Sequence, residues 1–122
     1  MAAVAKKMMV AYDGSESARR ALDRAAELAG YGATVTVVRV GSSERDEALL
    51  VEARKHLAER HIRARVVQRF GEAAETLVES ATAEDVDLLI LGRNRDGVAQ
   101  PALGSVSTEV IGNVSCDVLV VR

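Results

Sequence analysis

The 122-residue sequence predicts an α/β fold, a doubly wound five-stranded parallel sheet with helices on both faces. Short apolar, β-branched runs alternate with segments of helical periodicity, and this alternation is typical of successive β-α-β units. Hydrophobic residues make up 48% of the chain and aromatic residues only 2%. The core must therefore consist of small aliphatic side chains, which suits helices packed closely on a parallel sheet. The length favours one domain, covering residues 1–122.

Strands are predicted where apolar runs are short and rich in β-branched residues. These runs are residues 8–12, 34–40, 62–70, 86–91 and 117–121. The third run is expected to be an edge strand, because Arg63, Arg65 and Arg69 would face water along it.

Helices are predicted where apolar residues repeat at helical spacing between the strands. They cover residues 15–29, 44–60, 71–83 and 105–114. Ser15 is the expected N-cap of the first helix, and Gly30 and Gly32 are its expected stops. The inward face of this helix is mostly alanine, which allows close packing on the sheet. The many charges of the second helix are expected to form a solvated face.

Composition also restricts the partners and the compartment. A net charge of -2 gives no basic surface, so nucleic acid is a poor candidate partner. The apolar runs are too short to cross a bilayer, and no secretion signal is predicted. The single cysteine, Cys116, is expected to be a buried or half-buried thiol in a reducing cytoplasm. His56 and His61 are expected to be surface histidines, because their spacing does not suit a metal site.

Two loops carry the residues best suited to binding a ligand. One is the Asp13-Gly14-Ser15 turn after the first strand, and the other is the segment 92–105 after the fourth strand. Small residues let the backbone approach a ligand, and a helix start offers free N–H groups to an anion. Ligands of such sheets bind at the carboxyl ends of the strands, where the strand order reverses. The two loops therefore indicate a reversal between the first and fourth strands.

Four segments together resemble the universal stress protein family over nearly the whole chain. They are Met-Val-Ala-Tyr-Asp-Gly-Ser-Glu-Ser at 9–17, Val-Asp-Leu-Leu-Ile-Leu-Gly at 86–92, Gly-Ser-Val-Ser-Thr-Glu-Val at 104–110 and Cys-Asp-Val-Leu-Val-Val-Arg at 116–122. The resemblance implies the strand order 3-2-1-4-5. It also implies a homodimer formed through the C-terminal strand.

Some members of that family bind ATP through a G-x2-G-x9-G-[ST] motif, and this chain matches the motif incompletely. Gly92 fits the first glycine, Arg95 stands in place of the second, and Gly104-Ser105 arrives one residue early. The resemblance assigns Asp13 and Val40 to the adenosine end of a nucleotide. It assigns Gly92, Gly104, Ser105, Val106 and Ser107 to the ribose and phosphates.

Each of these residues also has a purely structural interpretation. Asp13 is suited to a turn at a helix N-terminus, and Ser105 and Ser107 are suited to helix capping. Arg95 adds steric cost where glycine would be free, and its side chain either fills the phosphate pocket or pairs with phosphate oxygens.

Three functions follow from the sequence. The first is an adenine-nucleotide-binding module for signalling or stress response, holding ATP or AMP, with Mg²⁺ only alongside ATP. The second is a nucleotide-free dimeric interaction protein of the same fold. The third is a slow ATPase, which has the least support because no catalytic residue is evident. No binding of nucleic acid or membrane is expected.

Overall fold

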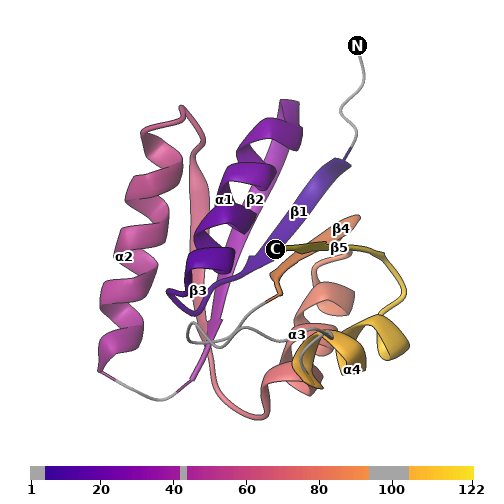
Figure 1. Ribbon diagram of the computed structural model, residues 1–122. Coiled ribbons are helices and arrows are strands. Elements are labelled where there is room, and N and C mark those ends of the chain that lie inside the picture. The colour runs from indigo at the N-terminus through magenta and orange to yellow at the C-terminus, as the bar shows by residue number, and fades with distance from the viewer. Residues whose placement is uncertain (1–4, 42–43, 94–104) are drawn as a thin grey trace.

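The computed structural model describes residues 5–41, 44–93 and 105–122. Within them, strands and helices alternate in the predicted order (Figure 1). The strands are β1 (Ala5–Ala11), β2 (Ala29–Val40), β3 (Ala64–Arg69), β4 (Leu88–Gly92) and β5 (Asp117–Val121). The helices are α1 (Glu16–Leu28), α2 (Arg45–Ala58), α3 (Ala73–Ala83) and α4 (Ser105–Asn113). None of these helices is long and apolar enough to span a bilayer.

The five strands form one parallel sheet in the order β3-β2-β1-β4-β5, so the predicted fold class and strand order are confirmed. β1 lies at the centre, with β2 and β4 on either side of it (Figure 1). The chain moves outward in one direction through β2 and β3, and in the other through β4 and β5. The order therefore reverses between β1 and β4, where the sequence places the ligand site.

Two hydrophobic cores lie on opposite faces of the sheet. Met8 and Val10 of β1 pack toward α1 and α2, and Met9 between them packs toward α3 and α4. This alternation is the consequence of successive strand side chains pointing to opposite faces. The alanines of α1 that face the sheet are fully buried, as predicted, and let this helix lie close to the strands.

The C-terminal end of α1 differs from the prediction. The helix ends at Leu28, and β2 already begins at Ala29, so Gly30 and Gly32 lie inside the strand rather than stopping the helix. Ala29 pairs with Ala5 of β1, and the register then shifts before Lys7 pairs with Thr34. The extra β2 residues form an irregularity in which Gly32 has φ +83°, a conformation that favours glycine.

Other boundaries differ by a few residues for local reasons. The predicted start of the third helix at Gly71 is wrong, because the Glu72 carboxylate caps it and α3 begins at Ala73. β3 is an edge strand as predicted, although Arg69 is half-buried while Arg63 and Arg65 are exposed. His61 is exposed, but His56 is half-buried because it contacts Asp23 of α1. Cys116 is half-buried, as expected.

Candidate functional site

A pocket of about 330 Å³ lies at the carboxyl ends of the central strands. The ends of β1, β2 and β4 and the N-terminal turns of α1 and α4 surround it, with α3 closing one side. The described lining residues are Ala11, Tyr12, Asp13, Ser15, Ala18, Val38, Arg39, Val40, Ala73, Leu77, Leu91, Gly92, Arg93, Ser105, Val106 and Ser107. The pocket therefore occupies the point of strand-order reversal, with a mainly aliphatic wall and polar groups at its rim.

The turn after β1 is held together by its own side chains. Asp13 Oδ1 accepts a hydrogen bond from the Ser15 amide at 2.9 Å, and Gly14 has φ +82°. Ser15 Oγ then accepts from the Ala18 amide at 3.2 Å, which confirms Ser15 as the N-cap of α1. The described residues donate no second hydrogen bond to the Asp13 carboxylate. Asp13 thus stabilises the turn with one carboxylate oxygen, and the described residues donate no hydrogen bond to the other.

The end of β2 presents its backbone toward the pocket. Val38 accepts from the Tyr12 amide at 2.9 Å, so its peptide groups face β1. Gly41 donates to Arg69 at 3.0 Å, so its peptide groups face β3. Because these directions alternate along a strand, the N–H and C=O of Val40 face the β1 side, beyond the point where β1 has ended. The described residues form no hydrogen bond with either group.

Gly92 closes the opposite side of the pocket and contacts α1 directly. A Cβ atom built on Gly92 would lie 2.6 Å from Ser17 Oγ, 2.7 Å from the Ala18 amide nitrogen and 2.8 Å from the Ser17 carbonyl carbon. Two of these three contacts are with backbone atoms, so no side-chain rotation relieves them. The fold itself therefore requires glycine here, whether or not a ligand binds.

The first turn of α4 completes the rim. Ser105 is exposed, Val106 is half-buried and Ser107 is buried, and all three line the pocket. The start of α1 lies on the pocket as well, so two helix N-termini point their amide groups and positive dipole ends toward it. Arg93 also lines this rim, and its amide donates to Val121 at 2.6 Å. The arrangement suits a small anionic group.

A buried carboxylate holds the β2 end in place. Asp46, at the start of α2, is 2% exposed. Its Oδ1 pairs with Arg39 Nε at 2.7 Å, and its Oδ2 accepts from Gln68 Nε2 at 3.1 Å. Gln68 also donates to the Gly41 carbonyl. These contacts fix the turn that follows Val40, and they correct the prediction that the charges of this helix are all solvated.

The structure brings the predicted site residues together as far as it describes them. Asp13, Val40, Gly92, Ser105, Val106 and Ser107 all line the same pocket. Arg95 and Gly104 lie outside the described residues. Asp46 was not predicted, because a charge in the first turn of a helix is ordinarily a surface feature. Among the described residues, no cluster of His, Cys, Asp or Glu side chains is suited to a metal ion.

Comparison with known proteins agrees with this architecture. The model of the universal stress protein family matches residues 5–57 and 41–122. The chain belongs to the universal stress protein family. Universal stress protein YxiE of Bacillus subtilis strain 168 is 32% identical over an alignment covering 95% of this chain and 98% of that protein.

Two solved universal stress protein structures are similar over almost the whole chain. One, in complex with cAMP, has a TM-score of 0.83 and 29% identity, covering 97% of both chains. The other, from Archaeoglobus fulgidus in complex with dAMP, has a TM-score of 0.81 and 22% identity, covering 95% of this chain and 97% of that one. At that identity the second likeness shows the fold alone.

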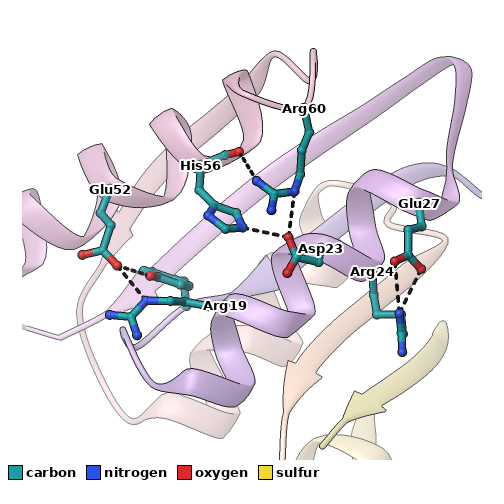
Figure 2. Close-up of polar contacts among 8 residues, drawn as sticks. Arg19, Asp23, Arg24, Glu27, Glu52, His56 and Arg60 are labelled. Carbon is teal, nitrogen blue, oxygen red and sulfur yellow. Dashed lines mark hydrogen bonds and ion pairs between the residues drawn. The ribbon is translucent and has the colours of Figure 1, made fainter.

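In this universal stress protein chain, a network of polar side chains joins the pocket wall to α2. Tyr12 is buried beside the pocket, and its hydroxyl donates to Glu52 Oε1 at 2.6 Å. The same oxygen accepts from Arg19 Nε at 3.1 Å, and Asp23 contacts His56 and Arg60 one turn further along (Figure 2). Burial and the bond to Glu52 raise the pKa of Tyr12, while the bonds from Tyr12 and Arg19 lower the pKa of Glu52. Tyr12 therefore stays a neutral donor, and the wall it forms is tied to the α1–α2 interface.

Proposed function

We propose that the pocket binds an adenine mononucleotide, and that the protein acts as a nucleotide-responsive signalling or stress-response module. The observation that carries this proposal is the unpaired backbone of Val40 at the edge of a pocket flanked by two helix N-termini. The unpaired backbone groups at a strand end can form hydrogen bonds with the edge of a base, and the free amides of helix N-termini can bind a phosphate. The cAMP complex of the relative that is 29% identical supports the same ligand class.

The Val40 backbone offers one donor and one acceptor side by side. Adenine carries the N6 amino donor next to a ring nitrogen acceptor, so one base edge satisfies both groups of Val40. The aliphatic wall that includes Val38, Leu77 and Leu91 would contact the faces of the base. We assign Asp13 to a ribose hydroxyl, because its second carboxylate oxygen is available as an acceptor.

The phosphate end of the ligand would lie at α4. Ser105, Val106 and Ser107 offer backbone amides there, and the side chains of Ser105 and Ser107 are additional donors. Gly92 would let the strand end approach the sugar and phosphate closely. A volume near 330 Å³ suits a nucleotide with one phosphate, since small-ligand pockets begin at about this size. ATP with Mg²⁺ is the alternative ligand.

The chemistry of the rim favours binding over catalysis. Among the described lining residues, Asp13 is the one carboxylate, and it is already bonded to the turn. Hydrolysis of a phosphate chain needs a base or a held water together with charge neutralisation at the leaving group. The described rim supports binding, and a slow ATPase remains the less favoured function.

Calorimetric titration tests this proposal. We expect AMP and cAMP to bind in the micromolar range, and GMP to bind at least about tenfold more weakly, because its base leaves the Val40 groups mispaired. Absence of heat with adenine nucleotides at millimolar concentration would refute nucleotide binding. Equal affinity for AMP and GMP would refute the assignment of Val40 to the base.

Asp13→Asn gives a sharper version of the same test. The asparagine oxygen retains the bond from the Ser15 amide, so the turn survives, but the charged acceptor for the ribose is lost. We expect about a tenfold loss of AMP affinity, the size of a charge-assisted hydrogen bond. Asp117→Asn makes the same change at the amino end of β5, away from the pocket, and should leave the affinity unchanged.

A second activity, self-association, is favoured by the edge strand β5. Val121 accepts from the Arg93 amide and so faces β4, which leaves the N–H and C=O of Val118 and Val120 on the open side. Val118, Leu119 and Val120 are only half-buried, and Ile111 of α4 is 46% exposed. We propose that two copies pair through β5, as the family resemblance implies.

Light scattering at several protein concentrations tests this dimer. Val120→Pro removes a donor on the open side of β5 without removing a bond to β4, and it should convert a dimer to monomer. Val66→Pro is a matched proline control, because by the same alternation it removes a donor from the open side of β3, the opposite edge strand, and it should leave the dimer intact. A wild-type protein that is monomeric at every concentration would refute the proposal.

A further inference from the structure

A second cavity, open and about 570 Å³ in volume, lies on the far side of α2 from the α1 network. This cavity lies between the outer face of α2 and the first residues of β3, two elements that lie next to each other in Figure 1. Its apolar floor is made by Val51, Ala58, Ile62 and Ala64. Its polar rim is made by His61 and by three cationic side chains, Arg54, Lys55 and Arg63. The cavity is separate from the nucleotide pocket and shares no lining residue with it.

The charge of this cavity is one-sided. Arg54, Lys55 and Arg63 are exposed, and no described residue forms an ion pair with any of them. No carboxylate is among the described lining residues. Elsewhere in the described chain, cations such as Arg19 and Arg65 form ion pairs with carboxylates. In a protein with more acidic than basic residues, this cluster is a local electropositive site that suits an anionic partner.

The adjoining strand edge offers hydrogen bonds as well as charge. Arg69 accepts from the Gly41 amide and therefore faces β2. By alternation, the N–H and C=O groups of Ala64 and Val66 face the open side of β3, which is an edge strand. An extended segment laid along this edge would form main-chain bonds there.

We propose that this second cavity binds an extended acidic peptide segment of a partner protein, and that the segment adds as a strand to the open edge of β3. Its main chain pairs with the outward groups of Ala64 and Val66. Its carboxylates contact Arg54, Lys55 and Arg63, and its alternate apolar side chains rest on Val51 and Ile62. The apolar floor and the free strand edge favour a peptide over a simple inorganic anion, which would use only the cations.

Fluorescence anisotropy with a labelled, end-capped peptide of alternating Glu and Val tests the proposal. We expect saturable binding that weakens as salt rises, and no binding of the matched Lys-Val peptide. Amide exchange should slow at Ala64 and Val66 when the peptide is bound, which a purely ionic contact would not cause. Failure of the Glu-Val peptide to bind at low salt would overturn the proposal.

Two variants localise the contact. Arg63→Glu should weaken peptide binding at least about tenfold, the same order as losing a charge-assisted bond. Arg122→Glu makes the same charge change beyond β5, at the opposite edge of the sheet, and should leave the affinity unchanged. Val51→Glu places a carboxylate on the exposed floor and should also abolish binding, while thermal unfolding confirms that each variant folds.

Three further outcomes would overturn the proposal. Equal losses in Arg63→Glu and Arg122→Glu would mean that only net charge matters. Equal binding of a Glu-Val peptide with N-methylated backbone amides would exclude strand addition. Complete displacement by tripolyphosphate, with no change in exchange at Ala64, would show an inorganic anion site.

Discussion

Gly92→Ala is expected to lower the free energy of unfolding by about 3 kcal/mol, at the upper end of what overpacking costs in a well-packed interior. The added methyl would meet the Ser17 and Ala18 backbone at 2.7–2.8 Å, so α1 or β4 has to shift. Urea unfolding measures the loss. The first turn of α1, which the added methyl would displace, also lines the pocket, so AMP affinity should fall in the same variant.

Gly112→Ala is the control for this substitution. Gly112 lies in α4, where an added Cβ would meet no atom within 4 Å apart from its chain neighbours and the adjacent backbone of its own helix, and its φ is not positive. Alanine there should raise stability by about 0.5–1 kcal/mol, because helical glycine is entropically costly. A Gly92→Ala protein as stable as the wild type would contradict the close approach of β4 to α1.

Asp46→Ala is expected to cost about 3 kcal/mol, because it strips a largely buried cation of its partner. Arg39 is only 24% exposed, and Gln68 would also lose one acceptor. Chemical denaturation measures this loss. The turn at Gly41 should loosen as well, since Gln68 holds its carbonyl, and AMP affinity should decrease through Val40.

Glu27→Ala is the matched comparison, because it also removes the carboxylate of an ion pair. The pair of Glu27 with Arg24 has a similar distance, 2.9 Å, but the two side chains are 62% and 52% exposed. Breaking an exposed pair costs less than about 1 kcal/mol. Asp46→Asn keeps the shape of the side chain and loses its charge, so its loss of unfolding free energy should lie between those of the two alanine variants. Equal losses of stability for Glu27→Ala and Asp46→Ala would mean that burial does not strengthen the Asp46 contacts.

The sequence predicted the strands, the helices and the fold class because burial leaves a periodic signature in each element. It failed at the end of α1, where glycine was interpreted as a helix stop. There the pairing of Ala29 with Ala5 draws the chain into the sheet before the glycines are reached. Pairing between distant segments overrides local propensity at such a boundary.

The candidate site was predictable where it depends on chain order and unpredictable where it depends on packing. Asp13 and Ser105 follow strands that the fold brings together, so a sequence pattern locates them. The burial of Asp46 depends on Arg39 and Gln68, which come from two different strands. Gly92 lines the pocket at the end of β4, as its place in the chain predicts, but its contact with α1 is visible only in three dimensions.

The two open edges of the sheet are chemically unlike, and this has a consequence for assembly. β5 offers an aliphatic edge, whereas β3 carries arginines and adjoins the cationic cleft. Head-to-tail stacking of β5 on β3 would press aliphatic side chains against those charges, so an open filament is disfavoured. Pairing of β5 with its own copy is instead self-complementary. The proposed association through β5 would therefore stop at two chains and would leave β3 exposed on each.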